Sequence, residues 1–128
     1  MHLDAIPSVR EPDLLFVAAA NLDRLGDNYL EGPADLVVEI VSPDSIGLDR
    51  GDKFAEYEKA GIPEYWLIDP LREQAEFYLL DRSHYRLADT RDGRFHSAVL
   101  PSFSLQIAWL WQEPLPNTLD ALREMKLL

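Results

Sequence analysis

No cysteine occurs in the sequence, which excludes disulfide bonds and zinc sites built from cysteine. The sequence also lacks a run of about 18 apolar residues, so a transmembrane helix is not expected. Its first residues, MHLDAIPSVREPD, contain neither the basic nor the apolar block of a signal peptide. We therefore expect a cytoplasmic protein. Its 128 residues, 47% of them hydrophobic, are enough for one globular domain spanning residues 1–128.

Basic residues are scarce: 12 Lys and Arg stand against 23 Asp and Glu, giving a net charge of −11. Tight, sequence-independent DNA binding depends on Lys and Arg that neutralise phosphates, so the surface as a whole is poorly suited to it. An acidic chain is compatible with a cation-binding cluster, or simply with a well-solvated surface. The charge balance therefore directs attention to acidic residues in unusual positions.

The stretch from Gly32 to Pro70 is the part around which the rest of the sequence is organised. Its pattern predicts a strand, a helix and a second strand, at Ala34–Ser42, Asp49–Ala60 and Glu64–Asp69. Asp49 suits the N-cap of the helix because its carboxylate can accept backbone N–H groups, and Gly61 suits the C-cap. This order of elements is typical of an α/β domain.

The segments on either side are predicted mainly as strands. Before the central stretch, the pattern predicts a strand at Asp13–Ala20 and then a loop with a short helical turn. After it, the pattern predicts three antiparallel strands, a half-buried strand and a terminal helix, at Gln74–Leu80, His84–Ala88, Arg94–Leu100, Ser102–Trp111 and Asn117–Leu128. The whole sequence therefore predicts a mixed, twisted sheet flanked by helices.

Glu39 is the residue that points to a function. It lies within a strand of Val and Ile, where a buried acid is costly unless a cation or a metal ion meets it. Alternation along the strand places one set of side chains on the same face, namely Asp35, Val37, Glu39 and Val41. Asp35 is about 13 Å from Glu39 along the strand, too far to share one ion. An acidic partner must come from an adjacent strand, and Asp13 is the best candidate.

The helix after this strand can bring Lys53 to the same place by packing back on the sheet. Two carboxylates and a lysine suit a hard cation such as Mg²⁺ or Mn²⁺, which prefers oxygen ligands. Such an ion polarises a phosphate and lowers the pKa of a bound water, while the lysine steadies the phosphate charge or orients that water. The pattern thus predicts metal-dependent phosphodiester hydrolysis, with Asp13 and Glu39 on the metal and Lys53 beside them.

Four runs of the sequence together resemble a known family: Pro12-Asp13, ADLVVEIVSP, Asp49-x-x-x-Lys53-x-x-x-Tyr57 and GIPEYWLIDP. They resemble the Uma-two (Uma2) family of bacterial restriction-endonuclease-like proteins, which is assigned to the PD-(D/E)XK nuclease superfamily. The resemblance covers roughly Glu11–Leu110. It implies a restriction-endonuclease-like core, DNA as the substrate, a divalent metal, and ligands at Asp13 and Glu39.

Two departures from the superfamily pattern accompany this resemblance. Val41 stands where the strand motif has its lysine, and the resemblance implies that Lys53 on the helix has taken over that role, as in other members of the family. Relatives carry a further helix and β-hairpin before the first Pro-Asp, whereas twelve residues precede Asp13. An acid on that helix often completes the metal site. The resemblance therefore implies an N-terminally shortened core.

Each candidate residue also has an ordinary structural explanation. Glu39 would face solvent if its strand lay at the edge of the sheet, and Asp13 would be a residue of a turn or strand start. Lys53 would be a solvated lysine paired with Asp49 one turn away. Tyr57 is expected to pack in the core, with a hydroxyl that lines the site as the alternative.

Other polar residues are expected to have structural roles. Asp35 is more typical of a strand entry than of a metal ligand, and Asp69 before a proline is typical of a turn. His84 and His96 would be solvated strand residues rather than a zinc pair. The arginines near one predicted hairpin form a solvated turn or, alternatively, guide a DNA backbone; they are Arg82, Arg86, Arg91 and Arg94.

A second function of a different class remains open. The chain would then be a catalytically weakened nuclease-fold module that acts in protein binding or oligomerisation. In either case a homodimer is expected, because the sheet edge near Asp13–Ala20 would be unpaired and apolar. Trp109, Trp111 and the apolar stripe of the terminal helix add more apolar surface than so small a core needs.

Overall fold

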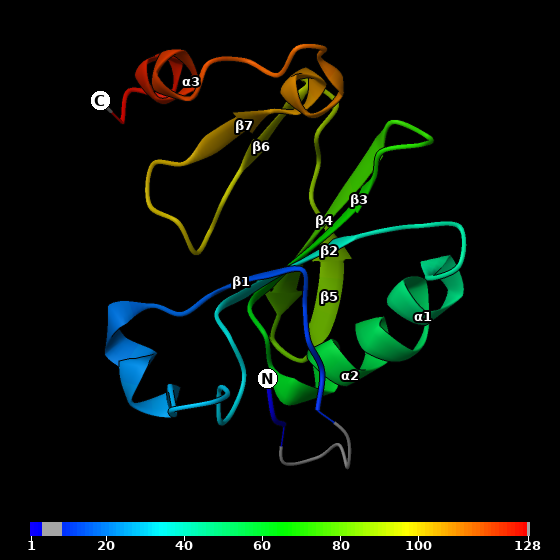
Figure 1. Cartoon of the computed structure of the whole chain (residues 1–128), viewed down its shortest axis with the longest axis vertical. Coiled ribbons are helices and arrows are strands. Elements are labelled where there is room, and N and C mark those ends of the chain that lie inside the picture. The colour runs from blue at the N-terminus through cyan, green and yellow to red at the C-terminus, as the bar shows by residue number, and fades with distance from the viewer. Residues whose placement is uncertain (4–8, 128) are drawn as a thin grey trace.

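A five-stranded mixed sheet forms the centre of the computed structural model, which describes residues 1–3 and 9–127 (Figure 1). Its strands are adjacent in chain order: β1 (Leu14–Phe16), β2 (Leu36–Ile40), β3 (Glu64–Asp69), β4 (Gln74–Asp81) and β5 (His84–Leu87). Strands β2 and β3 are parallel, and the other neighbouring pairs are antiparallel. The fold is therefore α/β with a mixed sheet, as the sequence predicts.

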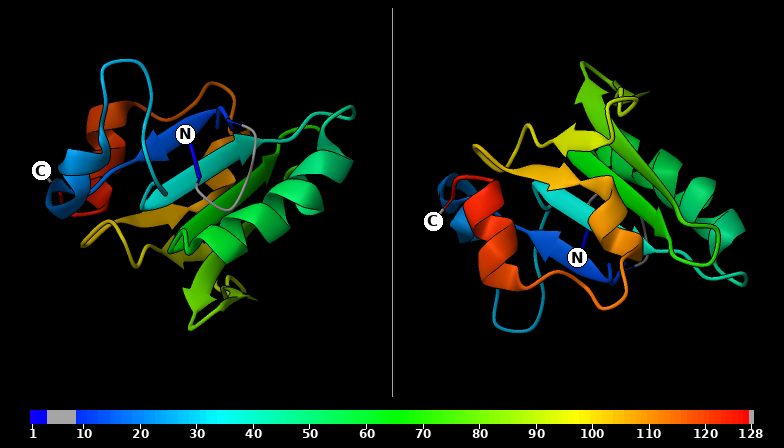
Figure 2. Two further views of the ribbon diagram at one scale, coloured as in Figure 1. Left: turned by 90° about the horizontal axis from the view of Figure 1, so that it is seen from below. Right: turned by 90° about the horizontal axis from the view of Figure 1, so that it is seen from above.

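Two helices join the parallel strands, α1 (Ile46–Arg50) and α2 (Asp52–Ala60), and they cover one face of the sheet (Figure 2). The sequence predicts one helix here, but the chain breaks it at Gly51. A Cβ on Gly51 would lie 2.8 Å from the Gly47 carbonyl oxygen, so the turn requires glycine. The prediction of Asp49 as an N-cap is therefore wrong, because Asp49 lies inside α1. The predicted C-cap is confirmed, since Gly61 ends α2 with φ 80.

The other face of the sheet is covered by the C-terminal part of the chain, drawn in yellow to red in Figure 1. It comprises a two-stranded antiparallel sheet, a 3-10 helix and a short α-helix: β6 (Arg94–His96), β7 (Ser104–Gln106), η2 (Ile107–Trp111) and α3 (Thr118–Glu124). Asn117 caps α3 by accepting from the backbone N–H groups of Leu119 and Asp120. None of the helices within residues 1–3 and 9–127 has the length and apolar character needed to cross a bilayer.

Two predictions for this C-terminal region are wrong. The strand at Arg94–His96 pairs with β7 and not with the β4–β5 hairpin, because buried Glu64 draws the segment after β6 onto β3 through the N–H groups of Ala98 and Val99. Ser102–Trp111 is not one strand, since only Ser104–Gln106 is extended before η2 begins. Residues 107–111 are apolar at every position, so a period of two does not distinguish strand from helix there.

The N-terminal strand is shorter than the sequence predicts. Only Leu14–Phe16 pairs with β2, and the chain then forms the 3-10 helix η1 (Ala19–Arg24). Asp35 accounts for this turn, because its carboxylate accepts hydrogen bonds from the Ala18 N–H at 2.7 Å and the Asn21 side-chain amide at 2.8 Å. The expectation that Asp35 serves strand entry rather than metal binding agrees with these contacts.

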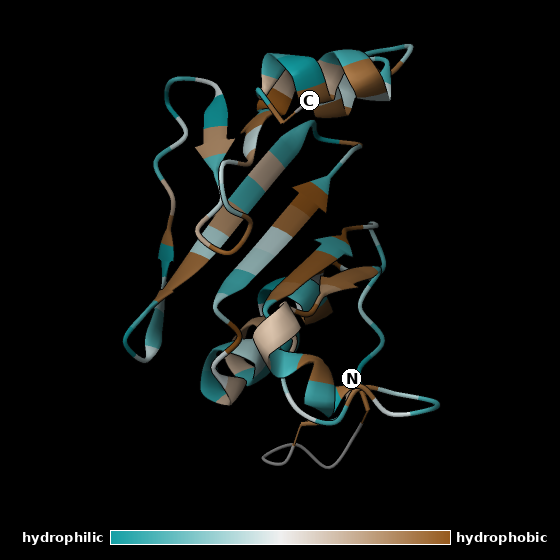
Figure 3. Cartoon of the chain, turned by 90° about the vertical axis from the view of Figure 1, so that its left-hand side faces the viewer, coloured by the Kyte–Doolittle hydropathy of each residue, from teal (hydrophilic) through white to brown (hydrophobic). Residues whose placement is uncertain are grey.

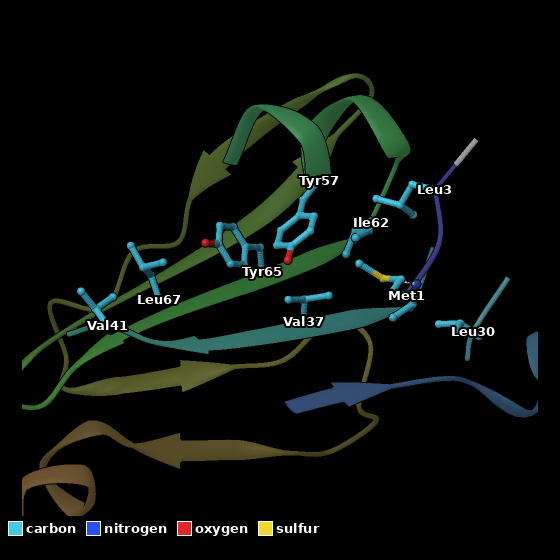
Figure 4. Close-up of a cluster of buried hydrophobic side chains, with 10 residues drawn as sticks. Met1, Leu3, Leu30, Val37, Val41, Tyr57, Ile62, Tyr65 and Leu67 are labelled. Carbon is cyan, nitrogen blue, oxygen red and sulfur yellow. Dashed lines mark hydrogen bonds between the residues drawn. The ribbon is translucent and has the colours of Figure 1, made fainter. Parts of the chain in front are cut away.

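The core lies in two clusters, one on each face of the sheet, and the central strands carry long apolar stretches between largely polar turns (Figure 3). The alternation predicted for β2 is confirmed: Val37 and Val41 belong to the cluster under α1 and α2, and Leu36 and Val38 to the other. Tyr57 and Tyr65 fill the helix-side cluster (Figure 4). Glu39 therefore lies on the face that α1 and α2 cover.

Candidate active site

Glu39 lies on β2, between β1 and β3, so it is not on an edge strand, and only 1% of the residue is exposed. Its Oε2 atom is 2.6 Å from the Lys53 Nζ atom and accepts a hydrogen bond from the Tyr57 hydroxyl at 3.3 Å. Its Oε1 atom accepts from the Asp13 backbone N–H at 3.1 Å. The buried carboxylate thus meets a cation and two neutral donors, which offsets part of its desolvation cost.

Lys53 reaches this carboxylate from α2. Its ammonium is also 3.0 Å from Asp49 Oδ1, and its side chain is 16% exposed. Burial alone would lower the pKa of Lys53, but the contacts with Glu39 and Asp49 outweigh burial and raise that pKa above its ordinary value. Lys53 is therefore a positively charged donor at neutral pH. The expected pairing with Asp49 is present, but this lysine is not a solvated one.

Asp13 lies directly before β1 and is exposed. Leu14 pairs with Val38, and continuing this antiparallel register by one residue puts Asp13 opposite Glu39. The Asp13 carboxylate accepts a hydrogen bond from the Ile40 N–H at 2.7 Å through its Oδ2 atom. The structure therefore brings the Asp13 backbone to the Glu39 carboxylate, and the Asp13 carboxylate to the backbone of the next residue.

Asp49 also belongs to this group, although the sequence interpretation gave it only the ordinary roles of an N-cap and a partner of a solvated lysine. It is 1% exposed, and its Oδ2 atom accepts from the Ser45 hydroxyl at 2.9 Å. Its backbone carbonyl accepts from the Tyr65 hydroxyl at 2.8 Å. The available signal was its spacing, since a residue four positions before Lys53 lies on the same side of a helix. That spacing predicted the pairing with Lys53, but not that both residues are buried beside Glu39.

Tyr57 serves both of its predicted roles. It is fully buried and packs edge-to-face on Tyr65, with ring centroids 5.2 Å apart (Figure 4). Its hydroxyl also donates to Glu39. Burial, and next the charge of Glu39, raise the pKa of Tyr57, so it remains a neutral donor. Tyr57 therefore fixes the orientation of the Glu39 carboxylate.

The other predicted candidates stand apart from this group. Asp69 accepts from the Arg72 N–H at 3.1 Å, which is the contact of a turn. His84 lies on β5 and His96 on β6, in different sheets. Within the described ranges, no three His, Asp or Glu side chains are arranged to hold a metal ion by themselves.

Three of the four arginines of the predicted cluster have acidic neighbours. Arg91 pairs with Asp89 at 2.7 Å, and Arg94 pairs with Glu124 on α3. Arg86 lies 3.9 Å from Asp81. These contacts agree with the ordinary alternative, a solvated set of surface ion pairs, and not with a tract set aside for a DNA backbone.

The mixed sheet, with helices between its parallel strands and a buried acid on one of them, defines an α/β fold. A family model described as "Putative restriction endonuclease" (Uma2) matches residues 4–108, and the chain belongs to this family. The family inferred from the sequence motifs is thereby confirmed.

Among solved structures, the chain is similar to a putative nuclease belonging to DUF820 from Anabaena variabilis ATCC 29413. The two share 21% sequence identity and superpose with a TM-score of 0.60, over 78% of this chain and 58% of the other. The present chain thus spans little more than half the length of that protein, and the likeness shows a common fold. No curated protein matches the chain.

Proposed function

We propose that this protein is an endonuclease that hydrolyses phosphodiester bonds in DNA with the help of a divalent cation. The observation that carries the proposal is the buried pair of Glu39 and Lys53, with 2.6 Å between the charged atoms. A buried ion pair contributes little stability compared with apolar residues of similar size. A structural role therefore explains this pair poorly, whereas a catalytic role requires these two groups.

The residues around the pair fit a hard cation. Glu39 and Asp49 carry two negative charges against the single positive charge of Lys53, and the backbone of Asp13 adjoins Glu39. Mg²⁺ is typically held by one or two carboxylates, with water and substrate phosphate completing its oxygen ligands. We propose Asp13 and Glu39 as its ligands, and Mn²⁺ as a substitute. A carboxylate has several lone pairs, so the contact of Asp13 with Ile40 leaves capacity for an ion.

Each protein group has a distinct task in this proposal. When bound, the cation would polarise the phosphodiester and lower the pKa of a bound water. The Lys53 ammonium donates to the phosphate oxygens or orients the attacking water, because it is charged and held at the site. Tyr57, a neutral donor, keeps the Glu39 carboxylate in one orientation.

Cleavage of supercoiled plasmid DNA with Mg²⁺ or Mn²⁺ tests the proposal. Replacing Glu39 by Gln keeps the shape of the side chain but removes its charge, and should slow cleavage by at least about a hundredfold. The exposed acid Glu73, replaced by Gln, is the control for the loss of one negative charge. Equal cleavage by wild type and Glu39→Gln would refute the assignment.

Metal binding provides a second test that does not require activity. A divalent cation that binds only the folded state should raise the melting temperature of the wild type. The rise should disappear in Glu39→Gln and persist in Glu73→Gln. An unchanged rise in Glu39→Gln would place the ligands elsewhere.

The alternative is a catalytically weakened module that uses the fold for protein binding or oligomerisation. It is favoured by the engagement of the Asp13 carboxylate with Ile40, at 2.7 Å, and by exposed apolar side chains at the β1 edge. Leu14 is 61% exposed and Phe16 36%. A chain that neither cleaves DNA nor responds to metal, yet dimerises, would support this alternative.

A further inference from the structure

We propose that Asp49 is a positioning residue for Lys53. Asp49 holds the Lys53 ammonium in the site when Glu39 binds a cation. This inference rests on the proposed function, because it explains how Lys53 remains in place when the Glu39 carboxylate also binds a metal ion. Asp49 itself is buried, and no contact with DNA is assigned to it.

Asp49 is held in place from two sides. The Tyr65 hydroxyl, from β3, donates to its backbone carbonyl at 2.8 Å, and the Ser45 hydroxyl donates to its Oδ2 atom at 2.9 Å. Ser45 is held in turn by the Ser42 N–H, which donates to the Ser45 hydroxyl oxygen at 2.9 Å. These contacts leave the Oδ1 atom directed at Lys53.

The Oδ1 atom has an unusual environment. Among residues 1–3 and 9–127, no backbone or hydroxyl group donates to this buried oxygen, and the Lys53 ammonium is the group that meets it. A buried carboxylate oxygen would be costly without such a partner. Its compensation is the charge of Lys53, whose Nζ atom lies 3.0 Å away. Because Asp49 is otherwise fully engaged, this oxygen serves the lysine alone.

The Lys53 ammonium therefore contacts two carboxylates, and only one of them is a proposed metal ligand. Glu39 is the acid that a cation would engage, and a cation on Glu39 weakens its attraction for the ammonium. Asp49 lies on α1, across the break at Gly51 from Lys53. It is not one of the proposed metal ligands, so its attraction for the ammonium remains when Glu39 binds a cation. A lysine has a flexible stem and strong hydration, so without Asp49 it would turn to solvent when Glu39 is occupied.

The accessibility of Lys53 to an amine-acylating reagent tests this without any measurement of activity. The chain has three lysines, and Lys59 and Lys126 are exposed, so they serve as internal references in mass spectrometry. Glu39→Gln imitates the loss of charge on Glu39 without any metal. In that variant Lys53 should remain protected relative to Lys59. In the double variant with Asp49→Asn it should react at least about tenfold faster, because both charges that hold it are gone.

The single variant Asp49→Asn provides the corresponding test, in which Mg²⁺ itself reduces the charge that Glu39 presents to Lys53. Lys53 should be protected without Mg²⁺ and become reactive with it, whereas it should stay protected in the wild type. In cleavage, Asp49→Asn should lower kcat by about ten- to a hundredfold and leave KM within about threefold, because a misplaced group affects the chemical step. Asp52→Asn, an exposed acid next to Lys53, is the matched control and should change nothing.

The outcomes separate this inference from the proposed function. If Lys53 is as protected in the double variant as in Glu39→Gln alone, the role of Asp49 is overturned, whatever the cleavage activity. Wild type that fails to cleave DNA would overturn the proposed function, while the Glu39→Gln background still tests the hold on Lys53. If Asp49→Asn does not fold, Ser45→Ala removes one support of Asp49. An unchanged reactivity of Lys53 in Ser45→Ala combined with Glu39→Gln would then overturn the inference.

Discussion

At the scale of single residues, the distribution of charge in the site determines both its stability and its chemistry. Glu39 and Asp49 are each 1% exposed and share one ammonium. Such a group is stable only as a unit, because removing the cation leaves two buried negative charges close together. The single lysine is therefore the residue on which the local structure depends most.

Replacing Lys53 by Met should destabilise the fold by about 3–5 kcal/mol, since the stem is conserved but the charge is lost. Urea unfolding of the wild type and the variant measures this difference. Lys59→Met, on the exposed side of the same helix, should change stability by less than about 0.5 kcal/mol. A small effect for Lys53→Met would show that the two acids do not depend on its charge.

At the scale of elements, the helical segment breaks at Gly51, between Asp49 on α1 and Lys53 on α2, and Lys53 contacts both Asp49 and Glu39. The strand β2 and the helical pattern of 52–60 follow directly from local periodicity, whereas the break depends on a close approach of two glycines. Nothing in the spacing of apolar residues marks Gly51 as different from an ordinary helix start. The sequence therefore predicts the helix and its contact with the sheet, but not the position of Asp49.

Two alanine substitutions test whether the break requires glycine at position 51. Gly51→Ala should destabilise by about 1–3 kcal/mol, because its Cβ would lie 2.8 Å from the Gly47 carbonyl oxygen. Gly47→Ala should be neutral or stabilising by up to about 1 kcal/mol, because its Cβ would meet nothing within 4 Å and alanine favours a helix. Thermal unfolding of both variants compares them. Equal stabilities would show that the break tolerates a side chain.

At the scale of the whole molecule, some apolar side chains near the surface pack against the core, whereas others remain exposed to solvent. Trp109 and Trp111 are partly buried and pack against the second core cluster, so they contribute to the fold. Leu14 and Ile40 remain 61% and 46% exposed at the β1 side of the sheet. An edge strand with exposed apolar side chains is a common place for another chain to pair.

We therefore expect a homodimer through this edge. Light scattering across micromolar concentrations should give a dimer mass for the wild type, and Leu14→Lys should shift it toward a monomer by placing a charge in the interface. Leu71→Lys, on an exposed apolar residue away from β1, is the control and should leave the mass unchanged. A monomer mass at all concentrations would rule out this assembly.

The sequence by itself determined the elements whose signal is local. The alternation along β2 placed Glu39 on the helix side, and the run Glu64–Asp69 identified β3 with its bounds. Only the tertiary structure decided the partner of β6, the break at Gly51 and the role of Asp49. The break depends on the close approach of Gly51 to Gly47, and the other two depend on contacts between distant residues, such as Glu64 with Ala98, 34 positions apart, and Tyr65 with Asp49, 16 apart. No periodic pattern encodes such contacts, because they arise when separate elements pack together.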